Sequence, residues 1–279
     1  MSSTHTRWAF RAVSLFLCLF FWASGCSALP ATLVRESNTK QPQALHARES
    51  ALKLPSVVYR GDGRDPSRIK EAGGFLPHSQ YPPLSELAFS VYNHVLDIIV
   101  DQNTRERNTI YVSTSSVFGI AAMFASNRTG GGWLYDISAA PNMISVEGTL
   151  LEESPFPEES EYAAIGGINW SQVAGWMFLS ENYTDMEWSR DEPHSEAEFF
   201  SLSYRYVRNP DYESRWDRYT ASVGQPQLAG FYGKKSDCNS KKPWMDYPLE
   251  VPSRLIKYAH QFMRPLAEVM GTDHFFRLF

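Results

Sequence analysis

The feature of the sequence that most constrains its fold is a series of short runs rich in β-branched and aromatic residues, separated by glycines and by helical segments. The runs that predict strands are residues 57–59, 109–113, 133–137, 162–165 and 173–179. Helical spacing or helix-boundary residues predict helices over residues 66–72, 84–100, 118–125, 209–219 and 252–269. These elements do not alternate in regular βαβ order, so we predict an α+β fold.

Residues 1–28 are typical of a secretory signal peptide. Arg7 and Arg11 precede a 12-residue apolar run, and small residues follow it, so we place cleavage after Ala28. The run is too short to cross a bilayer, which takes about 20 residues. A lipoprotein signal at Cys26 is the alternative. In either case the sequence predicts export, and we expect a secreted protein.

The remaining chain is acidic and poor in cysteine. Removing 28 of the 279 residues leaves 251, changes the net charge from -5 to -7 and retains one of three cysteines, Cys238. One cysteine excludes a disulfide-dense scaffold. The acidic balance argues against a nucleic-acid-binding protein. The next segment, residues 29–54, is polar without a sustained period and is predicted to be a linker or pro-segment.

Several common catalytic and metal-binding motifs are absent from the sequence. It contains no HExxH, CxxC, GxSxG or Walker motif, and its seven histidines are scattered. The sequence therefore predicts no metal centre and no phosphate-binding P-loop.

Three separate segments contain side chains suited to chemistry at a common site. Arg60 follows the first predicted strand, Ser113 ends the second, and the acidic tripeptide Glu159-Ser160-Glu161 precedes the fourth. Residues i and i+2 of an extended segment face the same side. We therefore expect the two glutamates to direct both carboxylates into one cleft.

Taken singly, each of these signals has a simpler interpretation. An acidic run is usually a solvated loop, and an arginine at a strand end usually lies on the surface. A second such tripeptide, Glu196-Ala197-Glu198, occurs in a segment predicted to be helical. There, side chains at i and i+2 point about 200° apart. Only the combination of segments therefore favours a functional site.

That combination resembles the A subunits of the heat-labile enterotoxin and cholera toxin family, the arginine-specific mono-ADP-ribosyltransferases. The matching segments are 58–66 (VYRGDGRDP), 69–74 (IKEAGG), 92–94 (YNH), 111–115 (YVSTS), 140–143 (APNM) and 159–168 (ESEYAAIGGI). Weaker matches extend the resemblance to about residue 244. It implies an ADP-ribosyltransferase fold, with split mixed β-sheets around an NAD cleft and flanking helices. It also implies a catalytic domain over residues 55–251, followed by a short helical tail over 252–279.

The resemblance carries the family's residue roles to matching positions. Arg60 would hold the phosphates or ribose of NAD. Ser113 would hold the catalytic glutamate and line the nicotinamide pocket. Glu161 would bind the ribose and stabilise an oxocarbenium-like transition state, and Glu159 would orient and help deprotonate the acceptor guanidinium. NAD is then a substrate, and no cofactor is expected.

Two further residues match supporting positions of the family's NAD site, Asp62 and His94. Each also has a structural interpretation, because an aspartate beside glycines often forms a turn. A histidine among apolar helical residues is likewise often structural.

The resemblance also implies partners, with one departure. The family's acceptor is an arginine of a host protein, usually a guanine-nucleotide-binding protein. Cys238 has no partner in the mature chain, so the family's disulfide to a helical tail is not expected, and docking to a binding subunit stays open. An NAD glycohydrolase that uses water as acceptor is one alternative function. A non-enzymatic secreted binding protein on the same scaffold is another.

Overall fold

The computed structural model describes residues 53–78, 85–96, 99–101, 106–181, 205–248 and 254–271. The predicted signal peptide, residues 29–52 and the second acidic tripeptide lie outside these residues. No helix among the described residues combines the length and the apolar character needed to cross a membrane.

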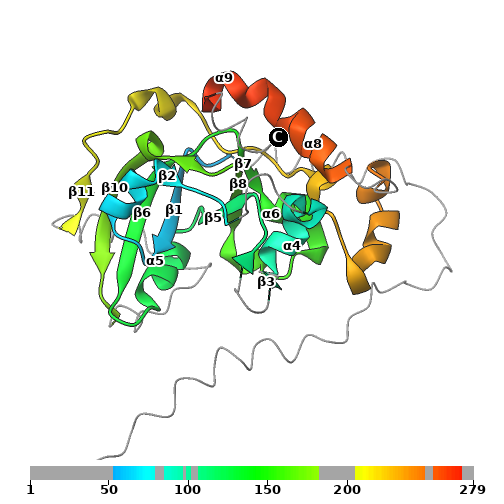
Figure 1. Ribbon diagram of the computed structural model, residues 1–279, viewed down its shortest axis with the longest axis horizontal. Coiled ribbons are helices and arrows are strands. Elements are labelled where there is room, and N and C mark those ends of the chain that lie inside the picture. The colour runs from blue at the N-terminus through cyan, green and yellow to red at the C-terminus, as the bar shows by residue number, and fades with distance from the viewer. Residues whose placement is uncertain are drawn as a thin grey trace, which may run out of the picture.

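A seven-stranded sheet in the order β11-β10-β6-β1-β5-β8-β7 forms the centre of the molecule (Figure 1). Its strands are β1 (Val57–Asp62), β5 (Tyr111–Ser115), β6 (Gly132–Ser138), β7 (Met143–Ser145), β8 (Glu161–Ile165), β10 (Val173–Leu179) and β11 (Val207–Arg208). Two small pairs accompany it, namely β2 (Gly74–Phe75) with β9 (Ile168–Asn169) and β3 (Ile99–Asp101) with β4 (Glu106–Arg107). All these strand pairs are antiparallel, and a parallel bridge outside the strands joins Ile144 to Ser222.

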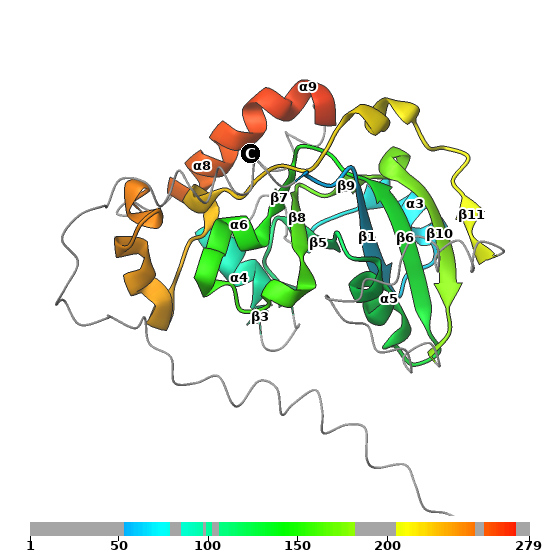
Figure 2. The same ribbon diagram turned by 180° about the vertical axis from the view of Figure 1, so that it is seen from behind.

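The sheet splits between β1 and β5. β1 pairs with β6 over all six of its residues, and β5 pairs with β8 over all five of its residues. Between β1 and β5, however, the paired residues are only Tyr59 and Ser115. Figures 1 and 2 show the resulting four-stranded and three-stranded halves side by side. The split predicted from the resemblance is therefore present.

Helices cover both halves of the sheet. They are α3 (Pro66–Glu71), α4 (Val91–Val95), α5 (Phe118–Ser126), α6 (Val146–Leu150), α8 (Arg254–Met263) and α9 (Ala267–Met270). Short 3-10 turns connect them: η1 (Glu86–Phe89), η2 (Leu151–Glu153), η3 (Pro157–Glu159), η4 (Trp170–Gln172), η7 (Ser214–Arg218), η8 (Pro226–Leu228), η9 (Gly233–Ser240), η10 (Trp244–Asp246) and η11 (Arg264–Leu266).

Helix α5 lies directly against the backbone of β1. Its buried alanines pack with Leu134, Met177 and Leu179 of the neighbouring strands. Gly61 makes the close approach possible, because a Cβ at this position would lie 2.2 Å from the carbonyl oxygen of Ala121. The helix is therefore held beside Arg60, which precedes this glycine.

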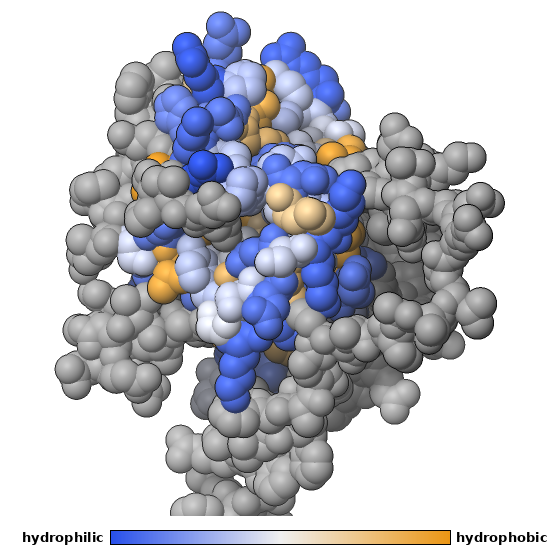
Figure 3. Space-filling view, turned by 90° about the vertical axis from the view of Figure 1, so that its right-hand side faces the viewer, coloured by the Kyte–Doolittle hydropathy of each residue, from blue (hydrophilic) through white to orange (hydrophobic). Residues whose placement is uncertain are grey.

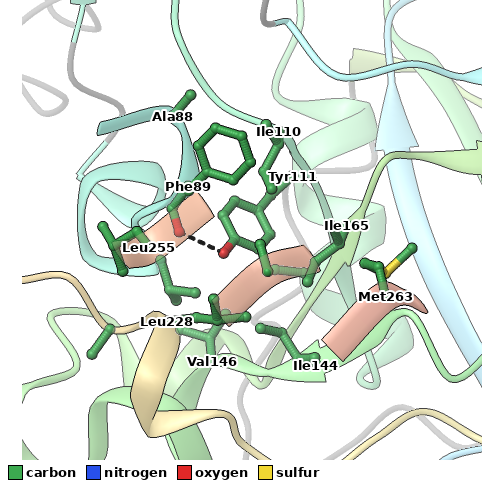
Figure 4. Packing of buried hydrophobic residues seen from close by; sticks show 14 of the residues in the cluster. Ala88, Phe89, Ile110, Tyr111, Ile144, Val146, Ile165, Leu228, Leu255 and Met263 are labelled. Carbon is green, nitrogen blue, oxygen red and sulfur yellow. Dashed lines mark hydrogen bonds between the residues drawn. The ribbon is translucent and has the colours of Figure 1, made fainter. Parts of the chain in front are cut away.

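The three-stranded half packs against α4, α6 and α8 in the largest core (Figure 4). Tyr111 lies at its centre, and its hydroxyl donates a hydrogen bond of 2.8 Å to the carbonyl oxygen of Phe89. Leu255 and Met263 of α8 are fully buried in the same cluster. Burying each such side chain contributes about 1.5–3 kcal/mol. The segment predicted to be a tail thus completes the core, while the predicted domain boundaries stay predictions.

Two long helices predicted from the sequence are interrupted in the structure. Residues 84–100 do not form one helix: η1 ends before Ser90, whose backbone is extended, and α4 starts after it. The Ser90 hydroxyl donates to the carbonyl oxygen of Gly230 at 2.7 Å and accepts from the Asn93 amide at 2.9 Å, so it fixes this break. Near the C-terminus, α8 ends before Pro265, because proline cannot continue a helical hydrogen-bond ladder.

Three smaller predictions also need correction. The strand expected at 57–59 runs on to Asp62 because β6 pairs with it throughout. The segment 139–150, predicted to be loop and strand, ends in α6, whose N-terminal amide at Gly148 donates to the Ser145 hydroxyl at 2.9 Å. The helix predicted over 209–219 is only a 3-10 turn, η7. The Asn209 amide donates instead to the carbonyl oxygens of Trp170 and Val173, which ties this segment to the sheet.

Figure 3 shows the side of the molecule that lies on the right in Figure 1. The described residues on this face are mostly hydrophilic, with apolar side chains in small, separate groups.

Candidate active site

A cleft of about 370 Å³ opens where the two halves of the sheet diverge. Five of the six predicted site residues line it: Arg60 from β1, His94 from α4, Ser113 from β5, and Glu159 and Glu161 from either side of the turn before β8. The structure therefore brings together residues that are up to 101 positions apart.

Arg60 spans the split in the sheet. Beyond the Tyr59–Ser115 pair, β5 has lost its neighbour on this side, and the carbonyl oxygen of Ser113 accepts a 2.6 Å hydrogen bond from Arg60 Nη1 instead. The Arg60 guanidinium also lies 5.3 Å from the centre of the Phe75 ring. These contacts fix the side chain at the base of the cleft.

Asp62 lies behind Arg60 and does not line the cleft. Its Oδ2 accepts from Arg60 at 3.1 Å and from Arg64 at 2.8 Å. Burial opposes ionisation of Asp62, but hydrogen bonds from Arg64 and the charge of Arg60 outweigh it and hold its pKa well below the usual range. Asp62 therefore positions Arg60 rather than reaching the cleft itself.

His94 connects three elements within the cleft. Its Nε2 lies 3.1 Å from Glu161 Oε1 and 3.0 Å from Ser113 Oγ, and its Nδ1 lies 2.9 Å from Thr109 Oγ1. The neutral tautomer with a proton on Nε2 fits these contacts, because Nε2 then donates to Glu161 while Nδ1 accepts from the Thr109 hydroxyl. His94 thus orients the Glu161 carboxylate.

Glu161 is buried yet remains an anion. Only 8% of this residue is exposed. Burial raises the pKa of its carboxyl group, but hydrogen bonds from His94 and Ser113 and the charge of Arg60 reverse that effect and leave the pKa below its usual value. The cleft therefore presents a fixed negative charge beside its donors.

The two glutamates converge by a different geometry from the one predicted. Glu159 ends the 3-10 turn η3, Ser160 adopts a left-handed conformation with φ 47°, and Glu161 starts β8. The segment is therefore not extended. Hydrogen bonds from Ser115 Oγ to the Glu159 carbonyl oxygen (2.7 Å) and from the Ser116 amide to the Ser160 carbonyl oxygen (3.2 Å) hold the turn against β5.

The environment shifts the two carboxyl groups in opposite directions. Burial and the neighbouring charges of Glu161 and Glu158 raise the pKa of Glu159 to about 7. A pair of carboxyl groups whose pKa values are driven apart is typical of sites in which each has a different role. Here Glu161 is the permanent anion, and Glu159 can take up or release a proton near neutral pH.

Sequence reasoning missed several residues that line the cleft. Thr109 holds His94, and Phe124, Arg128 and Phe156 lie along the wall. Thr109 stands two residues before the YVSTS segment, a proximity that gave a weak signal. The others come from helix α5, the turn after it and the acidic loop, and no motif marks them. Among the described residues, no group of three or more metal-ligating side chains is present.

Comparison with known proteins assigns this arrangement to a family. The heat-labile enterotoxin alpha chain family matches residues 45–254. The chain belongs to this family. It is 33% identical over 172 residues to the A chain of heat-labile enterotoxin IIB of Escherichia coli, with 57% of this chain and 65% of the relative covered. It is 29% identical over 151 residues to the cholera enterotoxin A polypeptide of Vibrio cholerae, with 52% and 58% covered. The matches thus span at most about two thirds of these relatives.

Solved structures give the same fold. A double mutant of heat-labile enterotoxin superposes with a TM-score of 0.53 at 23% identity, covering 78% of this chain and 95% of that one. A mutant of the E. coli heat-labile enterotoxin gives a TM-score of 0.50 at 26% identity, covering 69% and 98%. The predicted α+β fold of the ADP-ribosyltransferase type is therefore confirmed.

Proposed function

We propose that this protein is a secreted, toxin-like mono-ADP-ribosyltransferase that transfers ADP-ribose from NAD to an arginine of a host protein. The observation that carries the proposal is the contact of His94 with both Glu161 and Ser113 at the split of the sheet, with Arg60 bridging the two halves. One relative, of Vibrio cholerae, is named as an NAD(+)–arginine ADP-ribosyltransferase and is 33% identical over 151 residues, with 52% of this chain and 25% of the relative covered.

The first chemical step is cleavage of the bond between nicotinamide and ribose. Nicotinamide leaves with the bonding electron pair and becomes neutral, so positive charge develops on the ribose, as in glycoside cleavage. The ionised Glu161 carboxylate opposes that charge. At about 4 Å and an effective dielectric of about 20, such a pair gains about 4 kcal/mol, which corresponds to about a thousandfold in rate.

The second step joins the ribose carbon to a guanidinium nitrogen of the acceptor, which loses one proton. Glu159 is placed to accept that proton, because its pKa is about 7 and it lies next to Glu161 in sequence and in the cleft. A base with a pKa near the working pH is best suited to this role. Arg60 and Ser113 need no proton change, since they orient the phosphate-ribose portion of NAD and Glu161, respectively.

The proposal extends to the partners expected from the sequence. NAD is consumed as a substrate, and no resident cofactor is required. The acceptor is an arginine of a host protein, with a guanine-nucleotide-binding protein as the first candidate. Among the described cysteines, Cys238 is fully buried in the core and so is not placed for a disulfide to a separate tail. A binding subunit is therefore not part of the proposal.

Incubation of the purified protein with NAD labelled in its adenylate portion, with agmatine as the arginine-like acceptor, tests the proposal. Labelled agmatine supports arginine transfer. Free ADP-ribose with unlabelled agmatine would replace the proposal by an NAD glycohydrolase, and unchanged NAD would favour a binding protein. The Glu159→Gln variant adds a control, because it should lose transfer to agmatine and retain hydrolysis.

A further inference from the structure

A second arginine reaches the cleft from the turn that follows α5. Arg128 lines the same cavity as Arg60, and its residue is exposed, whereas Arg60 is largely buried. Among the described residues, no carboxylate forms an ion pair with Arg128. Its charge at the cleft is therefore available to a ligand.

The backbone that carries Arg128 is anchored on both sides of the turn. The Gly131 amide donates to the Arg128 carbonyl oxygen at 2.8 Å, and the Gly130 amide donates to Glu181 Oε2 at 2.9 Å. The side chain crosses Gly63, where an added Cβ would lie 3.1 Å from Arg128 Nη1 and 3.3 Å from its Cδ. Arg128 is thus directed towards the end of β1, where Arg60 begins its own contacts.

This corner of the cleft holds more positive than negative charge. Asp62 neutralises part of the charge of Arg60 and Arg64, and Arg128 adds a third guanidinium. Burial lowers the pKa of Arg60, and the charges of Arg64 and Arg128 lower it further, against the opposing effect of Asp62. A bound anion would relieve this repulsion, and guanidinium groups suit phosphate oxygens by charge and by geometry.

We propose that Arg128 binds the diphosphate of NAD together with Arg60, as a positioning residue for the dinucleotide. The inference rests on the proposed function and adds a residue to it. The diphosphate does not react, so Arg128 contributes mainly to binding before the chemical step. Its loss should raise KM for NAD and leave kcat nearly unchanged.

The test compares the wild type, Arg128→Gln and the control Arg208→Gln, which removes an exposed arginine on β11 outside the cleft. Isothermal titration measures Kd for NAD, ADP-ribose and nicotinamide. We expect Arg128→Gln to weaken NAD and ADP-ribose by about fivefold, the effect of losing an exposed ion pair of about 1 kcal/mol. Nicotinamide, which has no phosphate, should bind as before, and the control should match the wild type for all three ligands.

Equal Kd values for ADP-ribose in the wild type and Arg128→Gln would overturn the assignment. An equal loss for nicotinamide would also overturn it, since that result indicates a general disturbance of the cleft. A wild type that binds no NAD would instead overturn the proposed function. The two failures are therefore distinguishable, and equal melting temperatures of the variants show that each is folded.

Discussion

Replacing Glu159 by glutamine should stabilise the protein at alkaline pH, the opposite of what is usual for a carboxylate. In the folded protein its pKa is about 7, against 4.5 in an unfolded chain. Between these values the folded state holds a proton that the unfolded state has lost. Stability therefore falls as the pH rises from about 4.5 to 7 and stays lower above that range. Since the carboxyl group is partly exposed, solvent screening reduces the effect to about 1–2 kcal/mol.

Urea unfolding at pH 5 and pH 8 measures this difference. Glu159→Gln should gain about 1–2 kcal/mol over the wild type at pH 8 and much less at pH 5. Glu152→Gln is the matched control, because Glu152 belongs to the same acidic stretch but is exposed and does not line the cleft. A gain for Glu159→Gln that is equal at both pH values would refute the argument, as would an equal gain for the control.

The same titration should appear in the activity. Only the ionised form of Glu159 can accept the proton of the acceptor, so wild-type transfer to agmatine should fall as the pH drops through about 7. Hydrolysis of NAD by the Glu159→Gln variant should lack this limb of the pH profile. A wild-type transfer rate that is unchanged between pH 6 and pH 8 would remove Glu159 from the proton-accepting role.

Three further predictions concern the support of the site. Thr109→Val removes the hydrogen-bond partner of His94 Nδ1 and should lower kcat about tenfold, whereas Thr109→Ser should restore it; unchanged kcat in the valine variant would contradict the network. Leu255→Ala should cost about 2–5 kcal/mol in urea unfolding because α8 completes the core, while the exposed control Lys257→Ala should change stability by less than about 0.5 kcal/mol. Gly61→Ala should destabilise the protein by more than about 2 kcal/mol, because the new Cβ would meet the carbonyl oxygen of Ala121 at 2.2 Å, and a wild-type melting temperature would disprove this packing.

Short-range patterns in the sequence predicted much of the fold. The runs around β5, β8 and β10 and the boundaries of α3 were apparent from β-branched residues, proline and glycine. The interruption at Ser90 was not, because it depends on a hydrogen bond to Gly230, 140 residues away. Local apolar spacing cannot reveal such a contact.

The candidate site divides in the same way. The predicted site residues were found through their motifs, but the left-handed Ser160 that turns Glu159 towards the cleft gave no signal in an acidic stretch. Arg128 was missed because its role depends on how closely α5 approaches β1 and on the space left by Gly63. Both distances are properties of the packed structure.

The most direct test of the central claim is the single-turnover rate of ADP-ribose transfer to agmatine in the wild type and in Glu161→Gln, with NAD binding measured alongside. Glutamine preserves the shape of the side chain and removes the negative charge that opposes the developing positive charge on the ribose. The expected result is a loss of about a thousandfold in rate with NAD affinity within a few-fold of the wild type. A Glu161→Gln variant that transfers ADP-ribose at the wild-type rate would contradict the account.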